Sequence, residues 1–291
     1  QQPVSARRFV HGPPVLFRAI GVPSLLPAMP GTVAFPPRVL LLGPSGCAHG
    51  LRQRPRLLRA HELLQGEGNI GHIMCPYHAW AYRLDGRLQV APHTKSLKGF
   101  DKSEICLDQV QVEEFCGFVY VNLDAHAAPL AEQSGDLRRE IMYWAPEVEE
   151  LTFGHRLSYD IKSNWKNVVD NFLECYHCPT AHKDFCTLVE MDTYKVTTHG
   201  IYSSHMAKAG REANKAYGTD GATVTDHAVW FLWPNTTLMR YPGRGNFMVW
   251  RFYPVGPEET YEEFDFFFET AEVNDDEKDA IAFMDGVVDP G

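Results

Sequence analysis

The stretch Trp165–His182, WKNVVDNFLECYHCPTAH, decides how the second half of this chain is interpreted. Asp170, Glu174 and His177 follow one another at steps of four and three residues, so on a helix they share one face. His182 comes five residues after His177, beyond a proline that is expected to end or bend the helix. Two imidazoles with carboxylates nearby form a ligand set for a divalent first-row metal.

A second metal motif lies upstream, in HIMCPYHAWAYRLDGRLQV at 72–90. Cys75 and His78 stand on one tight loop, and the Asp-Gly pair at 85–86 between alternating segments predicts a β-hairpin. The loop supplies half of a zinc site or half of the ligands of a two-iron cluster, unless the pair is coincidental. A cluster in which two His replace two Cys on one iron is of the Rieske type. A matching pair upstream is Cys47-Ala48-His49.

Composition limits the possible classes of protein. The 291 residues carry a net charge of −10, which argues against nucleic acid as a partner, and no apolar run is long enough to span a membrane. Seven cysteines, several beside histidines, favour reduced thiols and metal sites over a secreted disulfide framework. We therefore expect a cytoplasmic protein, and the first residue, which is not Met, suggests a piece of a longer chain.

Residues 1–60 differ in composition from the rest of the chain. They contain eight Arg and ten of the twenty Pro but no Asp, Glu or Lys, and no sustained helical or strand periodicity. We interpret 1–60 as an aberrant or poorly ordered segment. A targeting segment, a disordered linker and a stretch foreign to the ancestral reading frame are the three alternatives.

Four segments carry a family resemblance: CPYHAWAYRLDG, GFVYVNLD, NWKNVVDNFLECYHCPTAH and YPGRGNFMVWRFYPV. Together they resemble the oxygenase α subunit of Rieske non-haem iron oxygenases. More narrowly, they resemble the branch that oxidises quaternary ammonium compounds such as glycine betaine, proline betaine and carnitine. Glu174 stands where many aromatic-ring oxygenases have Asp, which favours this branch. The resemblance covers about residues 61–291.

The resemblance implies an α+β fold in two domains. An N-terminal all-β Rieske [2Fe-2S] domain is expected over 61–130. A helix-grip-like catalytic domain, with an antiparallel sheet and helices around a mononuclear iron, is expected over 131–291 and to be incomplete at its C-terminal end. It also implies a homotrimer, and electrons supplied by an NAD(P)H-dependent reductase.

The resemblance also assigns site residues. His177 and His182 correspond to ligands of Fe(II), and a 2-His-1-carboxylate triad leaves open positions for O₂ and substrate. Glu174 corresponds to the carboxylate between this iron and a Rieske histidine of a neighbouring subunit, which couples the two metal centres. Asp170 is a second candidate catalytic carboxylate, with a structural role as the alternative.

The chain departs from the family pattern at two ligand positions. Cys47 and His49 lie nine residues too early, with 25 residues between His49 and Cys75 where the family has roughly seventeen. A longer loop would deliver them at small cost in free energy, since loop entropy grows slowly with length; otherwise this half of the cluster is absent. The third iron ligand is expected just past Gly291, with Asp289 as the stand-in candidate and Asp285 as a solvent-facing one.

Aromatic residues suggest the substrate site. A quaternary ammonium cannot donate a hydrogen bond, so its recognition relies on cation–π contacts in an aromatic cage. The candidates, each with an ordinary core role as the alternative, are Trp230, Trp233, Tyr241 and Phe247, with Phe231 and Trp250 nearby. We interpret three histidines, His199, His205 and His227, as pocket-wall or structural residues. We interpret two arginines, Arg240 and Arg244, as candidate partners for a carboxylate of the substrate.

The sequence thus predicts an oxidoreductase, the terminal oxygenase component of a Rieske-type system. It would pass electrons from a [2Fe-2S] cluster to Fe(II), activate O₂ and hydroxylate an N-methyl group, with loss of formaldehyde. One alternative is an aromatic-ring dihydroxylating oxygenase α subunit, a dioxygenase with the same metals. The other is an inactive remnant with incomplete metal sites.

Overall fold

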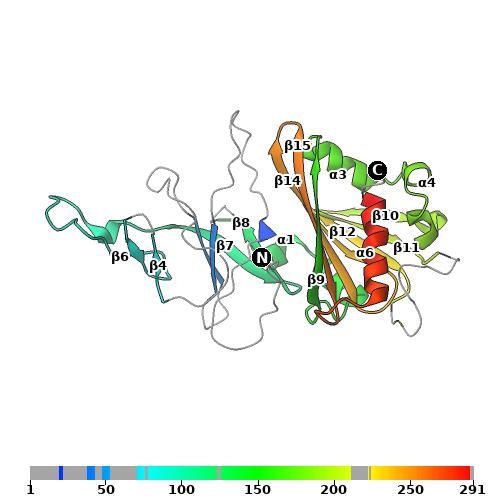
Figure 1. Cartoon of the computed structure of the whole chain (residues 1–291), viewed down its shortest axis with the longest axis horizontal. Coiled ribbons are helices and arrows are strands. Elements are labelled where there is room, and N and C mark those ends of the chain that lie inside the picture. The colour runs from blue at the N-terminus through cyan, green and yellow to red at the C-terminus, as the bar shows by residue number, and fades with distance from the viewer. Residues whose placement is uncertain are drawn as a thin grey trace. The chain divides into compact units, whose positions relative to one another are not determined.

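The computed structural model describes residues 20–21, 38–42, 48–52, 71–75, 78–122, 126–210, 222 and 224–288. These residues fall into two compact units, one running through Pro129 and the other starting at Leu130 (Figure 1). None of the described helices is long and apolar enough to cross a membrane. The predicted α+β architecture with antiparallel sheets is confirmed.

The first unit contains two small sheets. A five-stranded sheet has the order β1-β8-β7-β3-β2, and a three-stranded sheet has the order β4-β5-β6. The strands are β1 (Ile20–Gly21), β2 (Arg38–Leu42), β3 (Ala48–Arg52), β4 (Ile73–Met74), β5 (Ala81–Tyr82), β6 (Leu88–Val90), β7 (Asp108–Phe115) and β8 (Phe118–Asn122). A 3₁₀ turn, η1 (Lys102–Glu104), follows β6.

The predicted hairpin is confirmed between β5 and β6. Tyr82 pairs with Leu88 across the turn, and Gly86 has a φ of 85°, which a residue without a Cβ adopts at little cost. The Asp85 side chain accepts a hydrogen bond of 3.1 Å from the Arg87 amide. The hairpin thereby places the loop that carries Cys75 against a small apolar core.

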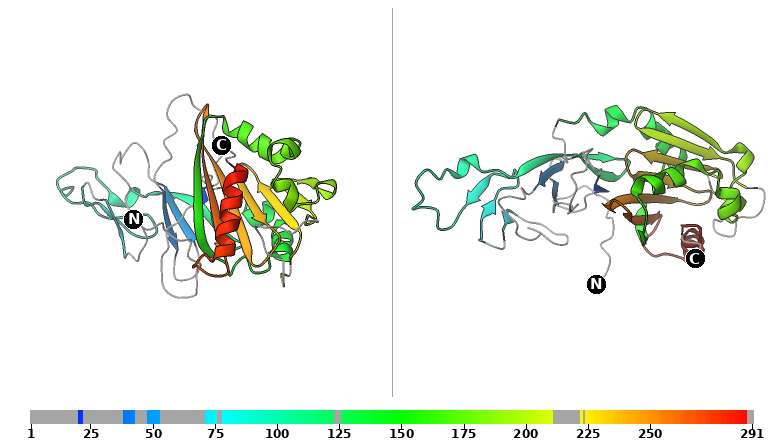
Figure 2. Two further views of the ribbon diagram at one scale, coloured as in Figure 1. Left: turned by 45° about the vertical axis from the view of Figure 1, so that its right-hand side comes forward. Right: turned by 90° about the horizontal axis from the view of Figure 1, so that it is seen from above.

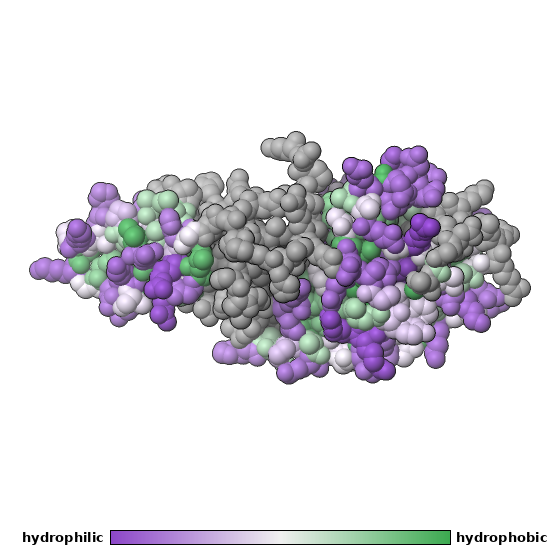
Figure 3. Space-filling model, turned by 90° about the horizontal axis from the view of Figure 1, so that it is seen from below, coloured by the Kyte–Doolittle hydropathy of each residue, from purple (hydrophilic) through white to green (hydrophobic). Residues whose placement is uncertain are grey.

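The second unit is built on one seven-stranded antiparallel sheet. Its order is β10-β11-β12-β13-β14-β15-β9, so the first strand in sequence closes one edge. The strands are β9 (Thr152–Ile161), β10 (Lys195–His199), β11 (Tyr202–Ala207), β12 (His227–Leu232), β13 (Thr236–Arg240), β14 (Asn246–Gly256) and β15 (Glu259–Phe268). On the right of Figure 3, the surface of the second unit is largely hydrophilic, with scattered hydrophobic side chains.

Helices cover the two faces of this sheet unequally. The helices are α1 (Leu130–Gln133), α2 (Leu137–Trp144), α3 (Trp165–Glu174), α4 (Cys178–Ala181), α5 (Phe185–Leu188) and α6 (Asp275–Val288), with a 3₁₀ turn η2 (Met191–Thr193). Residues of α3, α5 and α6 pack with one face of β14 and β15. Figure 2 shows α3 and the long α6 beside the strands. Glu140 of α2 instead meets Trp230 and Tyr202 on the other face.

Alternation along the strands separates an apolar face from a charged one. On β15, Phe264, Phe266 and Phe268 belong to the core with α6, because every second side chain points to the same face. On the opposite face Arg156 binds Asp265 through two hydrogen bonds of 2.5 and 2.7 Å, and Arg251 donates to the same carboxylate at 2.7 Å. The two faces therefore have different chemistry, and the site lies on the apolar one.

A reciprocal cap begins α6. The Glu277 amide donates to the Asn274 side chain at 3.0 Å, and the Asn274 amide donates to the Glu277 carboxylate at 2.8 Å. This reciprocal pair satisfies two amides that the first turn of a helix leaves without partners. It fixes where α6 begins on the sheet.

Candidate metal and substrate site

The site begins where α3 ends. Asn164 caps the helix by accepting a hydrogen bond of 3.0 Å from the Lys166 amide, and buried Val169 packs with Phe231. Cys175 then adopts a left-handed conformation with a φ of 41°, which stops the helix at Glu174.

The prediction that Pro179 ends or bends this helix is wrong. Pro179 lies in the first turn of the next helix, α4, where a missing N–H breaks no helical hydrogen bond. His177 is therefore not on the face of α3. It stands at the cap position before α4, and His182 stands at the other end of that short helix.

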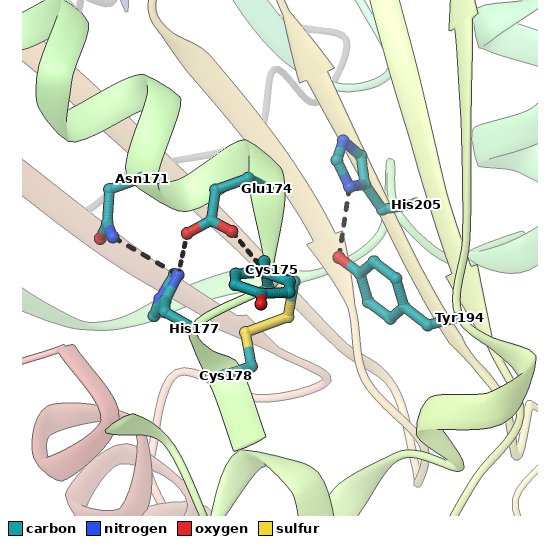
Figure 4. The surroundings of a disulfide bond; sticks show 8 residues. Asn171, Glu174, Cys175, His177, Cys178, Tyr194 and His205 are labelled. Atoms are coloured by element: carbon teal, nitrogen blue, oxygen red, sulfur yellow. Dashed lines mark hydrogen bonds and ion pairs between the residues drawn. A yellow bond between two sulfur atoms is a disulfide. The ribbon is translucent and has the colours of Figure 1, made fainter. Parts of the chain in front are cut away.

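A disulfide joins Cys175 and Cys178 on either side of His177 (Figure 4). The expectation of reduced thiols is wrong for this pair, because the tight turn brings the two Cα atoms to 5.0 Å, within the range of a disulfide. It holds for the other described cysteines, Cys75, Cys106, Cys116 and Cys186.

Glu174 is hydrogen-bonded to the chain around His177. Its Oε1 accepts from Nδ1 of His177, and its Oε2 accepts from the Tyr176 amide at 2.6 Å (Figure 4). The bond to His177 lowers the pKa of Glu174, with help from the Tyr176 amide, so this exposed carboxylate is ionised at neutral pH. With Nδ1 donating to Glu174, Nε2 of His177 keeps its lone pair for a metal.

His177 and His182 lie close enough to bind the same metal ion. Their ring centroids are 4.9 Å apart with the planes at 76°. Burial and the neighbouring His177 both lower the pKa of His182, which favours the neutral imidazole that a metal binds. Nδ1 of His182 is buried and has no hydrogen-bond partner among the described residues. A buried polar atom without a partner costs free energy, so the pair fits a metal site better than a purely structural role.

The structure brings no third ligand to this pair within the described residues, which contain no group of three or more His, Cys, Asp or Glu placed to hold a metal ion. Asp170 is exposed on α3, next to the buried Val169, and does not line the cavity described below. Asp285 is exposed, as predicted, and accepts a hydrogen bond of 2.7 Å from Tyr159. Asp289 lies outside the described residues.

The two histidines open onto a cavity of about 380 Å³ between the apolar face of the sheet and the helices. Its walls are mostly apolar and aromatic, and none of the described residues that line it is Lys or Arg. They are Ile161, Ser163, Asn167, Val168, Asn171, Phe172, Cys175, His177, Cys178, His182, Phe185, Tyr194, His227, Val229, Met239, Tyr241, Trp250, Glu262, Met284 and Val287. Such a space accommodates a small organic molecule next to a metal.

Of the four aromatic residues proposed for the substrate site, Tyr241 lines this cavity. Trp230 lies on the other face of β12, where its indole donates to Glu140 at 2.9 Å, and Phe247 lies on the corresponding face of β14. Trp233 follows the end of β12, is 44% exposed and lies beside Trp165. These three residues are not cavity residues, because strand alternation turns the first two away and the third lies beyond the strand.

Two buried histidines near the cavity are neutral. Burial lowers the pKa of His205 to about 4, and burial together with His205 lowers that of His227 to about 3. His205 is held by Tyr194 at 3.2 Å and Ser203 at 3.0 Å, while His227 lines the cavity. His199 stacks on Tyr202 and is not among the lining residues. These observations agree with pocket-wall and structural roles.

The two arginines proposed as carboxylate partners do not reach the cavity. Arg240 is 1% exposed and contacts Glu147 at 3.2 Å and the Gly243 carbonyl at 3.0 Å on the other face of the sheet. Arg244 is exposed in the following turn and does not line the cavity. Sequence reasoning missed Glu262, which does line it. Its spacing of two and four residues before Phe264 and Phe266 marks it as an acid on an apolar face.

In the first unit, backbone hydrogen bonds hold Cys75 to the residues that follow His78. The Cys75 amide donates to the Trp80 carbonyl at 2.8 Å, and the Ala79 amide donates to the Cys75 carbonyl at 3.0 Å. Cys75 is fully buried and His78 is exposed. Of the upstream pair, Cys47 and the side chain of His49 lie outside the described residues; the backbone of His49 is in β3. One thiol and one imidazole from a single loop fit half of a Rieske ligand set.

Family models match both units. The Rieske [2Fe-2S] domain matches residues 47–101, and the ring hydroxylating alpha subunit (catalytic domain) matches residues 148–286. The first match includes Cys47, His49, Cys75 and His78; the second includes His177 and His182. The two cofactors of this family, a [2Fe-2S] cluster and Fe(II), are those predicted from the sequence.

Two curated relatives are oxygenases of quaternary ammonium compounds by name. The chain is 36% identical over 233 residues to the carnitine monooxygenase oxygenase subunit of Escherichia coli (strain K12), covering 80% of this chain and 62% of that protein. It is 31% identical over 223 residues to the chloroplastic choline monooxygenase of Beta vulgaris, covering 75% of this chain and 48% of that protein. The chain thus spans less than two thirds of the length of either relative.

Solved structures agree with these matches. The quaternary ammonium Rieske monooxygenase CntA in complex with an inhibitor aligns with a TM-score of 0.74 and 30% identity, covering 87% of this chain and 68% of that one. Naphthalene 1,2-dioxygenase aligns with a TM-score of 0.63 at 21% identity, covering 87% of this chain and 65% of that one, which shows the fold alone. By its two domains and its similarity to CntA, the chain belongs to the Rieske non-haem iron oxygenases, as a relative of their α subunits.

Proposed function

We propose that this chain is part of a terminal oxygenase that hydroxylates a quaternary ammonium compound. The observation that carries the proposal is the cavity, which joins His177 and His182 to aromatic walls and has no Lys or Arg among its described lining residues. A permanent cation without hydrogen-bond donors suits such walls, because aromatic faces attract it and no positive side chain repels it. The CntA structures with L-carnitine and with γ-butyrobetaine show that a relative binds such compounds.

Within this proposal His177 and His182 hold Fe(II), and Cys75 and His78, with Cys47 and His49, hold the [2Fe-2S] cluster. The bound metals would supply electron transfer and O₂ activation. The chain's own residues then bind and orient the substrate: the rings of Phe172, Tyr194, Tyr241 and Trp250 surround it and exclude water. Asp289 is proposed as a third ligand only if no residue beyond Gly291 supplies it.

We propose that Glu174 links the iron site to a neighbouring subunit. Glu174 is 43% exposed while bonded to His177, and Tyr176, two residues further along the chain, is 92% exposed. A carboxylate with one end on a metal ligand and the other at the surface can accept a hydrogen bond from a histidine of another copy. This exposure supports an interface with another copy of the chain, while the homotrimer and electron entry from a separate reductase stay predictions. A cytoplasmic location stays a prediction.

The proposed reaction is N-methyl hydroxylation. One oxygen atom of O₂ enters a C–H bond of the N-methyl group, and the other leaves as water after two electrons and two protons are supplied. The resulting N-hydroxymethyl compound loses formaldehyde as the C–N bond breaks, and the hydroxyl proton passes to the amine nitrogen. Hydroxylation at a different carbon of the same substrate would release no formaldehyde.

Product analysis tests the proposal. After reconstitution with iron and sulfide and supply of a reductase, choline, carnitine and glycine betaine are incubated separately, with naphthalene as the competing substrate class. Formaldehyde and the demethylated amine from one of the ammonium compounds are expected. Oxidation of naphthalene alone contradicts the proposal and supports the aromatic-ring alternative.

Cluster assembly separates an active oxygenase from an inactive remnant. After reconstitution, the reduced protein is examined by EPR. A Rieske-type signal that disappears in Cys47→Ser supports the long-loop ligand pair. Absence of the signal from the unmodified chain means that electrons have no cluster to pass through, and the chain is then a remnant.

A further inference from the structure

Glu262 is an acid on the apolar face of the sheet. Its neighbours on the same face of β15, Phe264 and Phe266, are core residues, and Glu262 itself is 1% exposed. It nevertheless lines the cavity that contains His177 and His182. Burying a carboxylate is costly in free energy unless something compensates its charge.

The protein around Glu262 supplies little compensation. Its Oε2 accepts a hydrogen bond of 2.9 Å from the Trp250 indole, which leaves Oε1 without a hydrogen-bond partner among the described residues. The next acids along β15 differ: Glu263 and Asp265 point to the other face, where Arg156 and Arg251 pair with both. Of these three acids, Glu262 is the one without a described cationic partner.

Among the described residues that line the cavity, no other group provides the missing positive charge. Burial holds the pKa of His227 at about 3 and raises that of Tyr194 to about 12, and it raises the pKa of Tyr241 as well. These groups are neutral near pH 7, and His177 and His182 are the proposed iron ligands. On the adjacent strand β9, Tyr159 faces exposed Asp285, which is itself an acid.

Two opposing effects set the pKa of Glu262. Burial raises its pKa to about 7, against the hydrogen bond from Trp250, which lowers it. The empty-cavity form is therefore partly protonated at neutral pH. A cation that enters the cavity favours the ionised form, because opposite charges attract strongly where water is excluded.

We propose that Glu262 is the counter-charge for the ammonium group of the substrate and selects cationic over uncharged molecules of the same shape. This inference rests on the proposed function. The ammonium lies against the ring of Trp250, whose indole N–H holds the carboxylate at 2.9 Å, so one residue orients the other. Glu262 attracts the cation without a hydrogen bond, since a quaternary nitrogen has none to give.

A purely structural role for Glu262, as acceptor for the Trp250 indole, makes a different prediction. Glutamine keeps an oxygen acceptor and the shape of the side chain but removes the charge. Glu262→Gln therefore retains the structural role and loses the proposed one. Glu259→Gln is the matched control, because Glu259 is an exposed acid on the same strand.

The experiment measures dissociation constants by calorimetry at pH 8 for choline and for 3,3-dimethylbutan-1-ol, its uncharged carbon isostere. The unmodified chain is expected to prefer choline. Glu262→Gln is expected to lose at least about 10-fold of this preference by weakening choline binding, whereas the isostere binds the same within about 2-fold. Glu259→Gln is expected to bind both as the unmodified chain does.

The outcomes separate this inference from the proposed function. A preference for choline that persists in Glu262→Gln overturns the inference and leaves the proposed function standing. An unmodified chain that binds naphthalene but not choline overturns both. If Glu262→Gln does not fold, Glu262→Met replaces it, since an uncharged apolar side chain of similar length suits this buried face: loss of the preference with unchanged isostere binding supports the counter-charge, and a retained preference contradicts it.

Discussion

At the scale of single residues, Glu174 has the contacts of a coupling group and Asp170 has those of a solvated side chain. Glu174 bonds to His177, whereas Asp170 is exposed one turn earlier on the same helix. The pair therefore offers a mutation and its control on one element. Both substitutions to the amide keep the shape of the side chain and remove one charge.

Glu174→Gln is expected to keep iron and lose turnover. A neutral amide binds the neighbouring histidines more weakly than a carboxylate does, so it should couple the two metal centres less well. Product formation in the assembled enzyme should therefore fall about 10- to 100-fold while iron content stays constant. Steady-state turnover and iron analysis measure the two. Asp170→Asn should leave both unchanged, and equal turnover in Glu174→Gln would show that the carboxylate is only structural.

Glu262→Gln should also change the pH dependence of stability. The folded-state pKa of about 7 lies above the ordinary value of 4.5, so the folded protein binds a proton that the unfolded chain releases. Stability is then lost as pH rises from about 4.5 to 7, by on the order of 3 kcal/mol in total.

Urea unfolding at pH 5 and pH 8 measures this effect. Relative to the unmodified chain, Glu262→Gln should gain stability at pH 8 and gain little at pH 5. A variant that is less stable at both values would mean that the carboxylate stabilises the fold. The expected gain would show that this buried acid reduces stability, as functional groups often do.

At the scale of elements, the sequence predicted what local rules determine. The Asp85-Gly86 turn is a local signal, and the structure confirms the hairpin that it predicts. The Asn274 cap and the alternation on β14 and β15 likewise depend on residues close together in the sequence. The end of α3 was wrong because two local signals competed. The helix ends at the left-handed Cys175, four residues before Pro179. No sequence rule says which of these two residues ends the helix.

Which aromatic residues face the cavity depends on tertiary structure. Strand alternation places Trp230 and Phe231 on opposite faces of the sheet, and likewise Phe247 and Trp250. It does not say which face α3 and α6 cover. The candidate iron ligands His177 and His182 could be proposed from the sequence because their motif is compact. The spacing of Glu262 to Phe264 and Phe266 separates it from Glu263 in the sequence, but nothing in the sequence says that this apolar face forms the cavity wall.

The contact between α5 and the end of β11 is a test of packing at this scale. The Gly210 amide donates to the Leu188 carbonyl at 2.8 Å, and a Cβ on Gly210 would lie 2.1 Å from the Thr187 carbonyl oxygen. Gly210→Ala should therefore destabilise the protein by about 1–3 kcal/mol and displace Phe185, which lines the cavity.

Thermal or urea unfolding of Gly210→Ala checks this prediction. The control is Gly286→Ala within α6, where nothing lies within 4 Å of the added Cβ. Since alanine is the better helix former, this control should gain about 0.5 kcal/mol. A neutral Gly210→Ala would mean that α5 is not packed as described.

At the scale of the whole molecule, the proposed coupling by Glu174 requires more than one copy of the chain. A homotrimer of 32.9 kDa chains has a mass of about 99 kDa, which sedimentation equilibrium measures directly. Removal of the exposed ring in Tyr176→Ala should weaken the assembly, since this ring stands beside Glu174. A monomer at all concentrations would contradict the proposed route of electrons between subunits.

The central claim is that His177 and His182 hold Fe(II) in the same cavity that receives a quaternary ammonium compound. EPR of the nitric oxide complex, formed after anaerobic addition of Fe(II), tests it without a reductase or an intact cluster. We predict an iron–nitrosyl signal that choline alters and that His177→Ala and His182→Ala abolish. A signal that choline leaves unchanged would contradict binding of the substrate beside the iron. A signal that survives at full intensity in both variants would contradict His177 and His182 as iron ligands.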